Sequence, residues 1–209
     1  MKQVAKPQKV PASGLYVITD PNHPQLIGAV EQALLGGACL IQYRDKRTDP
    51  TSRRAQALDL LHCCAAYQVP LIINDDVSLA ADIGAAGVHL GHADMPLAQA
   101  RQLLGPDAII GVSCYNQWHL AEHYAPQADY IALGCFFLSK TKPQAALADI
   151  ALLQRAQTLS CPIVAIGGIN QHNGQALVAA GANLLAVIQG VFSAPDIRQA
   201  AQQLTHLYL

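Results

Sequence analysis

Polar and charged side chains directly follow several short apolar runs of this chain. The run 38–41 is followed by Gln42, Tyr43, Arg44, Asp45 and Lys46. Arginine offers a planar fork of N–H donors to phosphate oxygens, lysine a point charge, and glutamine a donor and an acceptor for the edge of a heterocycle. Because side chains alternate along a strand, Gln42, Arg44 and Lys46 share one side. The cluster predicts a phosphate-ester site, and the alternative is a solvated strand end with a salt bridge to Asp45.

Acidic residues follow the next two apolar runs. Asn74, Asp75 and Asp76 come after the first of these runs, and Asp94 comes shortly after the second. Mg²⁺ commonly binds one or two carboxylates and completes its coordination with water and substrate phosphate oxygens. We therefore expect Asp75 and Asp94 to bind Mg²⁺ if their loops are neighbours. The alternative is helix capping, which we expect for Asp76 and which the following Met95-Pro96 would also allow for Asp94.

Three further segments carry candidate binding groups. Ser113 closes an apolar run, and its hydroxyl would lie where that run ends. A long irregular connection over 135–146 contains Ser139, Lys140, Thr141 and Lys142, which could wrap an anion and close over it as a lid. Gly167-Gly168 follows a later run, and paired glycines let a backbone approach a phosphate closely. A plain surface loop is the alternative for the long connection.

Apolar runs and amphipathic segments alternate along the whole chain. The predicted strands are Leu15–Thr19, Ala38–Tyr43, Pro70–Asn74, Gly87–Leu90, Ile109–Ser113, Tyr130–Gly134, Ile163–Ile166 and Leu184–Ile188. The predicted helices are Gln25–Leu35, Thr51–Tyr67, Val77–Ile83, Pro96–Leu104, Gln117–Tyr124, Leu147–Thr158, His172–Ala180 and Pro195–Tyr208. This α/β rhythm predicts a single (β/α)8 barrel, in which the carboxyl ends of the strands meet at one mouth and build the site. An open doubly wound sheet is disfavoured, because the turn 19–23 lacks a glycine-rich phosphate loop.

Composition limits the class of protein. The chain has 209 residues, a net charge of −1 and 52% apolar residues, which suits one large domain with a sizeable core. We expect a flexible leader over 1–12 and a catalytic barrel over 13–209. The charge argues against a nucleic-acid partner, and no apolar stretch is long enough to span a membrane. The six cysteines lack C-x-x-C spacing and predict buried thiols of a cytoplasmic protein. Apolar outer helix faces could support a homodimer.

Taken in order, the short motifs resemble those of the thiamine phosphate synthase family. The resemblance runs from about Leu15 to Phe192. The motifs are Gln42-Tyr43-Arg44-Asp45-Lys46, Ile73-Asn74-Asp75, Gly87-Val88-His89-Leu90-Gly91, Asp94-Met95-Pro96, Gly111-Val112-Ser113, Thr141-Lys142 and Ala165-Ile166-Gly167-Gly168-Ile169. The resemblance implies a (β/α)8 enzyme that joins a pyrimidine diphosphate to a thiazole phosphate, releases pyrophosphate and uses Mg²⁺ as its cofactor.

The resemblance also implies roles for individual residues. The groups that would hold the pyrimidine diphosphate are Gln42, Arg44, Lys46, Asn74, Ser113 and Lys142. Within the motifs, Tyr43, Asp45 and Lys140 would line the substrates. The catalytic set would be Arg44, Lys46, Ser113 and Lys142, and the Mg²⁺ ligands Asp75 and Asp94. The thiazole phosphate would bind Ser139, Thr141, Gly168 and the backbone at Ile188-Gln189.

Two departures from the family pattern lie on the thiazole side. The segment 134–142 lacks two prolines and has Ser139 in place of a threonine, which keeps the hydroxyl but should loosen the loop. Gln189 stands where the family usually has serine. Two alternatives stay open. One is an isomerase resembling thiazole tautomerases, with His89 or His92 moving the proton. The other is a non-catalytic protein that binds phosphate ligands.

Overall fold

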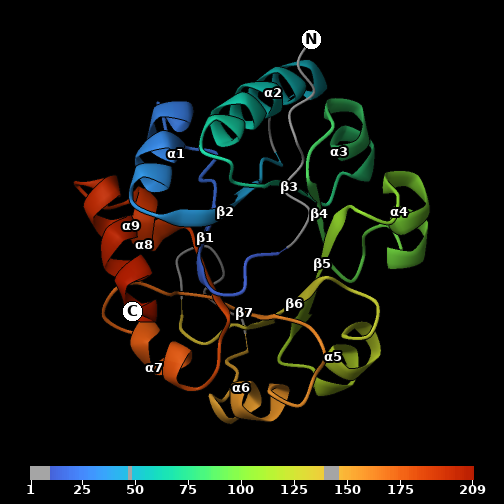
Figure 1. Cartoon of the computed structure of the whole chain (residues 1–209), viewed down its shortest axis with the longest axis vertical. Helices are drawn as coiled ribbons and strands as arrows, with labels where there is room; N and C mark the ends of the chain where they lie inside the picture. Colours follow the sequence, from blue (N-terminus) through green and yellow to red (C-terminus); the bar gives the residue numbers. More distant parts are fainter. Residues whose placement is uncertain (1–9, 47–48, 139–145) are drawn as a thin grey trace.

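The computed structural model describes residues 10–46, 49–138 and 146–209. Within these ranges, parallel strands pair in the order of the sequence, and β8 pairs with β1 to close a barrel (Figure 1). This confirms the (β/α)8 barrel and excludes the open sheet. The strands are β1 (Gly14–Ile18), β2 (Ala38–Tyr43), β3 (Leu71–Asn74), β4 (Gly87–Leu90), β5 (Ile109–Tyr115), β6 (Tyr130–Gly134), β7 (Ile163–Ile166) and β8 (Leu184–Val187).

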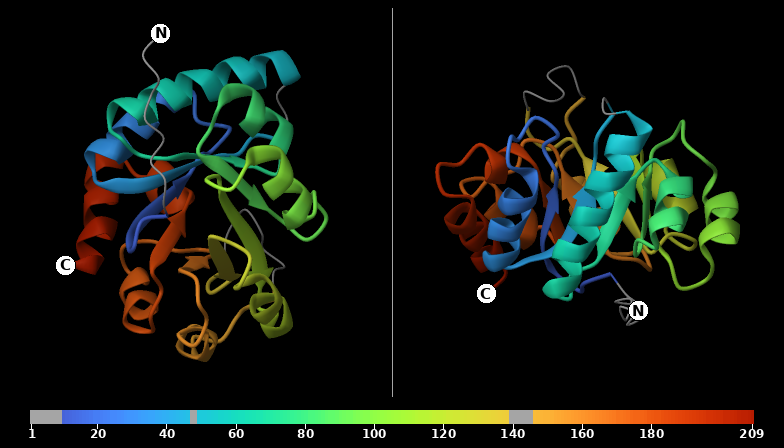
Figure 2. Two further views of the ribbon diagram at one scale, coloured as in Figure 1. Left: turned by 45° about the vertical axis from the view of Figure 1, so that its right-hand side comes forward. Right: turned by 90° about the horizontal axis from the view of Figure 1, so that it is seen from above.

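Helices surround the barrel, and the carboxyl ends of the strands lie at the top of the right-hand view in Figure 2. The helices are α1 (Leu26–Leu35), α2 (Pro50–Ala66), α3 (Val77–Ile83), α4 (Leu97–Leu104), α5 (Trp118–Tyr124), α6 (Ala151–Ala156), α7 (Gly174–Ala179), α8 (Gln189–Phe192) and α9 (Ile197–Thr205), followed by the short 3-10 helix η1 (His206–Tyr208). Over the described ranges, none of them has both the length and the apolar character that crossing a bilayer demands.

Strand alternation creates two apolar layers. Side chains such as Leu40, Ile72 and Val164 fill the barrel interior. Their strand neighbours, such as Ile41 and Ile73, belong to the layer between the barrel and the helices. Burying one such aliphatic side chain stabilises the fold by about 1.5–3 kcal/mol, so the two layers hold the strand ends in fixed positions.

Two segments differ from the pattern expected from the sequence. The helix predicted over 147–158 is confined to α6, because Ala148 N–H donates to Cys135 O at 2.8 Å and Asp149 Oδ1 accepts from Ala151 N–H at 2.8 Å. The first contact ties the segment to the end of β6, and the second starts the helix after Asp149. The additional helix α8 follows β8 directly and was not predicted.

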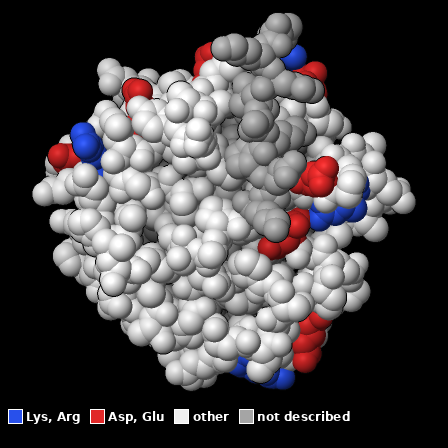
Figure 3. Space-filling model, viewed as in Figure 1, with Lys and Arg blue, Asp and Glu red and all other residues white. Residues whose placement is uncertain are grey.

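The amino ends of the strands form the face of the barrel opposite to the mouth. Residues 1–9 of the predicted leader lie outside the described residues, whereas Val10 packs against the barrel interior. The boundary at residue 12 stays a prediction. Figure 3 looks onto this face, and where described residues are visible their charged side chains form small separate groups.

Candidate active site

The carboxyl end of β2 carries the first predicted cluster. Gln42 is 2% exposed and lies inside the barrel, where its Nε2 donates to the Tyr16 hydroxyl at 2.6 Å. The backbone N–H of Arg44 donates to Thr19 Oγ1 at 2.9 Å, which fixes the chain as it leaves the strand. Beyond it, Lys46 Nζ lies 2.8 Å from Asp75 Oδ2. The cluster thus reaches from the barrel interior to the acidic residue after β3.

Tyr43 points away from this cluster. It belongs to the layer between the barrel and the helices, and its hydroxyl donates to Gln56 Oε1 of α2 at 2.9 Å. Burial, with the nearby Asp45 carboxylate, raises the pKa of Tyr43 to about 12. The structure therefore separates the Tyr43 side chain from Gln42, whereas Asp45 and Lys46 line a common cavity with Asp75.

Asp75 has an unusual backbone conformation. Its φ of 63° lies in the left-handed region, which non-glycine residues adopt rarely and at some energetic cost. Asp75 N–H donates to His89 O on the neighbouring strand β4 at 2.9 Å, and this contact holds the conformation. Asp94 lies in the turn after β4, and its carboxyl group is within hydrogen-bonding reach of that of Asp75. The predicted convergence of the two acidic residues is therefore present.

The two carboxyl groups have opposite electrostatic surroundings. Burial acts to raise the pKa of Asp75, but hydrogen bonds from Lys46 and Asp94 outweigh it and leave the pKa below its ordinary value. Burial also raises the pKa of Asp94; the Gly91 N–H opposes this, but the neighbouring Asp75 carboxylate adds to it, and the pKa stays above its ordinary value. When both carboxyl groups are ionised, their negative charges repel each other, and a divalent cation bound by both would offset that repulsion.

Two carboxylates are a donor set that is compatible with Mg²⁺. Across the described residues, no group of three or more His, Cys, Asp and Glu side chains could hold a metal ion. A closed zinc site would need such a group. Mg²⁺ needs only one or two carboxylates, because water and substrate phosphates fill the remaining positions.

Helix capping separates the neighbouring acidic residues. Asp76 caps α3 as expected, because its Oδ1 accepts from Leu79 N–H at 2.9 Å. The alternative cap at Asp94 is wrong, since α4 begins at Leu97 and Pro96 occupies the cap position. Asp94 Oδ2 instead accepts from Gly91 N–H at 2.6 Å. The contact holds this carboxylate within its own turn, beside Asp75.

A chain of hydrogen bonds crosses the barrel interior from Gln42 to Ser113. Tyr16 and Tyr130 share a hydrogen bond of 2.8 Å between their hydroxyls, and the Tyr130 hydroxyl lies 3.0 Å from His89 Nδ1. His89 Nε2 lies 2.9 Å from Ser113 Oγ. The two tyrosines were missed in the sequence. Each tyrosine stands in an otherwise apolar strand, at a position whose side chain alternation directs into the barrel, as it does for Gln42. This alternation was the feature of the sequence that could have identified them.

The ends of β6 and β7 form the side of the mouth expected to bind the thiazole phosphate. Phe137 N–H donates to Gly167 O at 3.1 Å, which pairs the two connections. Gly168 has a φ of 62°, and a Cβ there would lie 2.6 Å from the carbonyl oxygens of Phe137 and Leu138. The predicted residues Ser139, Lys140, Thr141 and Lys142 lie outside the described residues. Because a Cβ at residue 168 would overlap the carbonyl oxygens of Phe137 and Leu138, packing between the two connections requires glycine at this position.

Gln189 joins the first and last strands of the barrel. It begins α8 after Ile188, and its Nε2 donates to Asp20 Oδ2 at 2.9 Å. Its Oε1 accepts from the Ser193 hydroxyl. The side chain is thus held within the protein, which leaves the backbone at Ile188-Gln189 as the part that a phosphate could meet.

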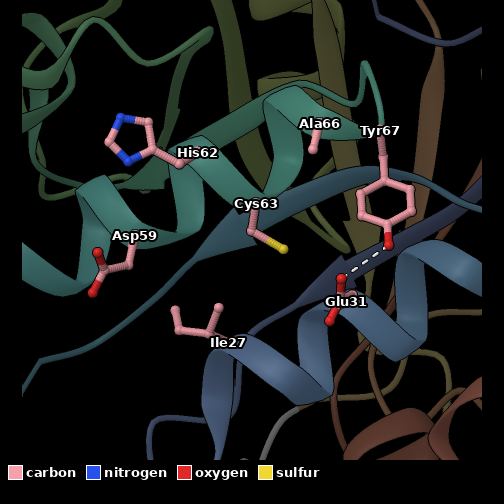
Figure 4. Close-up of a pocket in the computed structure, with 7 residues that line it drawn as sticks. All are labelled: Ile27, Glu31, Asp59, His62, Cys63, Ala66 and Tyr67. Carbon is pink, nitrogen blue, oxygen red and sulfur yellow. Dashed lines mark hydrogen bonds between the residues drawn. The ribbon is translucent and has the colours of Figure 1, made fainter.

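A cavity of about 440 Å³ lies beside the acidic pair. It is lined by Asp45, Lys46, Arg53, Asn74, Asp75, Asp76, Val77, Ser78 and Met95. Another cavity, of about 420 Å³, lies between α1 and α2 on the outside of the barrel, where Tyr67 donates to Glu31 (Figure 4). Active sites of (β/α)8 barrels lie at the carboxyl ends of the strands, so the first cavity belongs to the candidate site.

Comparisons with known proteins identify relatives over nearly the whole chain. The sequence model described as "Thiamine monophosphate synthase" matches residues 15–191. The thiamine-phosphate synthase of Thiobacillus denitrificans is 47% identical over 199 residues, which cover 93% of this chain and 94% of the relative. The thiamine-phosphate synthase of Methylobacillus flagellatus is 49% identical over 201 residues, covering 95% and 96% of the two chains.

A solved structure is similar as well. The thiamine phosphate pyrophosphorylase of Pyrococcus furiosus superimposes with a TM-score of 0.86 at 31% identity, covering 93% of this chain and 95% of that chain. The two relatives and the solved structure each match more than nine-tenths of this chain. The chain belongs to the thiamine monophosphate synthase family.

Proposed function

We propose that this protein is a thiamine phosphate synthase. It condenses 4-amino-2-methyl-5-hydroxymethylpyrimidine diphosphate with 4-methyl-5-(2-phosphoethyl)thiazole to thiamine phosphate and pyrophosphate; the carboxylated form of that thiazole would give the same products and release CO₂ as well. Family membership supports the reaction. The observation that carries the proposal is the meeting of Lys46 and the Asp75–Asp94 pair at the same mouth. Cationic and acidic groups at that place suit a diphosphate bound with a divalent ion.

The chemistry requires little more than positioning and charge. The C–O bond between the pyrimidine methylene and the diphosphate breaks, and its electron pair leaves with pyrophosphate. The thiazole nitrogen then uses its lone pair to form the new C–N bond. Arg44 and Lys46 would neutralise charge on the leaving group, together with Lys142, and no protein base is needed.

We further propose Mg²⁺ as the cofactor, with Asp75 and Asp94 as its protein ligands. Mg²⁺ bound there supplies positive charge that makes the diphosphate a better leaving group. Lys46 keeps the Asp75 carboxylate ionised and therefore able to bind a cation. Asn74 ends β3 beside this pair and lines the same cavity, where its amide can meet the diphosphate.

The remaining predicted residues divide between the two substrates. Gln42 and Ser113 would hold the pyrimidine ring in the barrel interior. The thiazole phosphate would lie between Gly168 and the backbone at Ile188-Gln189, with Ser139 and Thr141. Of the two histidines considered for an isomerase, His89 has both ring nitrogens in hydrogen bonds within the protein. That histidine is poorly placed to shuttle a substrate proton.

Location and assembly are also proposed. The cysteines are free, and burial raises the pKa of Cys39 and Cys161 to about 11, so both remain thiols. Free thiols, three of them buried and three partly buried, suit a reducing cytoplasm. A homodimer stays a prediction that light scattering can measure.

The test is an assay of the purified chain with both substrates and Mg²⁺. Pyrophosphate and thiamine phosphate should appear in equal amounts, and chelation of the metal should stop both. Formation of neither product would contradict the function. Binding of the pyrimidine diphosphate without turnover would favour the non-catalytic alternative, and isomerisation of a thiazole precursor would favour the tautomerase alternative.

A further inference from the structure

We propose that Tyr16, Tyr130 and His89 are positioning residues that fix which atoms of Gln42 and Ser113 face the substrate. The three side chains connect Gln42 to Ser113 through hydrogen bonds inside the barrel. The inference rests on the proposed function and deepens it, because it assigns the selection of an aminopyrimidine over its oxo counterpart to residues that do not touch the ring.

When His89 is neutral, the hydrogen bonds from Gln42 to Ser113 all donate in the same direction. The hydroxyls of Tyr16 and Tyr130 could donate in either direction, but because Gln42 Nε2 already donates to Tyr16, only donation from Tyr16 to Tyr130 leaves the Tyr16 hydrogen paired within this series of hydrogen bonds. The Tyr130 hydroxyl then donates to His89 Nδ1. Since Nδ1 accepts, the ring proton lies on Nε2, and Nε2–H donates to Ser113 Oγ. Each hydroxyl accepts one hydrogen and donates its own to the next group.

Burial makes a break in this chain costly. Tyr16 is 1% exposed and Tyr130 is 0% exposed, and burial raises the pKa of both far enough to keep them neutral. Their rings meet edge to face with centroids 5.8 Å apart, and His89 stacks on Tyr130 at 5.5 Å. Little freedom remains for the hydroxyls to find other partners. An unpaired buried hydroxyl would lose its hydrogen bond without regaining water.

The two ends of the chain therefore present a defined pattern to a ligand. Gln42 uses its Nε2 within the protein, which leaves Oε1 as an acceptor for an exocyclic amino group. Ser113 accepts from His89, which leaves its hydroxyl hydrogen as a donor to a ring nitrogen. A 4-aminopyrimidine offers this combination of donor and acceptor, whereas a 4-oxo ring reverses it.

Removing the Tyr130 hydroxyl should change the orientation of the Gln42 carboxamide. In Tyr130→Phe, the Tyr16 hydroxyl loses its acceptor and regains one only by donating to Gln42. The carboxamide must then rotate, so that its oxygen meets Tyr16 and its amino group faces the substrate. Tyr16→Phe releases Gln42 directly and serves as a second variant in case the first fails to fold.

The experiment compares the 4-amino substrate with the diphosphate of the 4-oxo analogue, tested as a competitive inhibitor. The wild-type protein should prefer the amino compound by roughly 100-fold, because a site built around hydrogen bonds rejects the reversed pattern strongly. In Tyr130→Phe and Tyr16→Phe the preference should fall below about tenfold, while the KM for the thiazole phosphate stays unchanged. If the two tyrosines served only to stabilise the fold, their substitution would not lower the preference for the 4-amino compound while leaving the KM for the thiazole phosphate unchanged.

The matched control is Tyr208→Phe. The Tyr208 hydroxyl is also buried and has no hydrogen-bond partner among the described residues, and it belongs to η1 outside the barrel. This variant should keep the wild-type preference. Nitrogen-15 NMR of the histidine side chains gives a readout without turnover, in which neutral His89 should carry its proton on Nε2 in the wild-type protein.

The outcomes separate the two proposals. A folded Tyr130→Phe or Tyr16→Phe variant that keeps the amino preference overturns the inference while the proposed function stands. His89 protonated on Nδ1 in the neutral wild-type protein overturns it as well. Absence of thiamine phosphate formation by the wild-type protein overturns the proposed function, and the inference with it.

Discussion

The ammonium group of Lys46 lies 2.8 Å from the carboxylate of Asp75. The Lys46 side chain is 60% exposed and that of Asp75 is 27% exposed. Ion pairs as exposed as this one contribute only about 0–1 kcal/mol to stability. The pair joins the ends of β2 and β3, and its main effect is on the charge of the mouth.

Lys46→Ala should therefore reduce activity far more than stability. We expect kcat to fall by about 10- to 100-fold, because a cation near the leaving group is lost. The free energy of unfolding should change by less than about 1 kcal/mol. Arg54→Ala is the control, since Arg54 Nε lies 2.6 Å from Asp82 in a similarly exposed pair on the outer surface. Steady-state kinetics and urea denaturation measure both effects, and equal kcat values for the two variants would contradict the assignment of Lys46.

Asp75→Asn should abolish the response to Mg²⁺ at limiting concentrations of the metal. The amide keeps the size of the side chain but removes the charge that attracts the cation, so turnover should fall by at least about 100-fold. Asp82→Asn removes a surface carboxylate and should have no such effect. Rates are measured across a Mg²⁺ titration. A wild-type rate for Asp75→Asn at limiting metal would remove Asp75 from the ligand set.

Gly111→Ala should displace the Tyr130 ring. A Cβ at Gly111 would lie 2.0 Å from Tyr130 Cζ, so the strand has no space for even a methyl group. Overpacking of this kind costs about 1–3 kcal/mol. We also expect the KM for the pyrimidine diphosphate to rise about tenfold, because the hydrogen bonds from Tyr130 through His89 to Ser113 are broken.

The control for this substitution is Gly28→Ala. A Cβ at Gly28 in α1 would meet nothing within 4 Å, and alanine should stabilise the helix by about 0.5–1 kcal/mol. Denaturation curves of both variants give the comparison. Equal stability of Gly111→Ala and the wild-type protein would show that the interior can adapt around Tyr130.

Asp49 should make stability depend on pH. Its carboxylate caps α2 and accepts from Thr51 N–H at 3.0 Å and Ser52 N–H at 3.1 Å. Hydrogen bonds from Ser52 and Thr51 lower the pKa of Asp49 from 3.8. A lowered pKa in the folded state means that this stabilisation is present above the unfolded pKa and is lost as the pH falls through the folded value.

The test is the difference in melting temperature between the wild-type protein and Asp49→Ala. The wild-type protein should melt higher at neutral pH, and the difference should shrink below a pH of about 3.8 as Asp49 is protonated. Circular dichroism follows both proteins across that range. A difference that stays constant through the acidic range would mean that the charge of Asp49 is irrelevant.

Local patterns in the sequence were sufficient to predict the barrel and its mouth. Apolar runs marked the strands, but Tyr43, which we expected to line the substrates, packs between the barrel and the helices. The signals at the start of α3 identified Asp76 as a cap, because a cap depends on residues only a few positions away. Asp75 and Asp94 could be brought together in the same way, since consecutive strands of a barrel are neighbours.

Contacts between distant residues could not be predicted. Tyr16 and Tyr130 are 114 positions apart, and which interior residues meet depends on the tilt and stagger of the closed strands. The contact of Gln189 with Asp20 has the same origin, because it joins the last strand to the first. At Asp94 the nearby proline suggested a helix cap, but the carboxylate accepts a hydrogen bond from Gly91 N–H instead.

The left-handed backbone at Asp75 has a consequence for moving this site onto another scaffold. Asp75 N–H is held by the carbonyl of His89, and the ring of the same histidine contacts Tyr130 and Ser113. A graft that carried the acidic loop alone would leave behind the strand that shapes it. A transplantable unit that keeps these contacts therefore extends from Leu71 through Tyr130, with its native register kept.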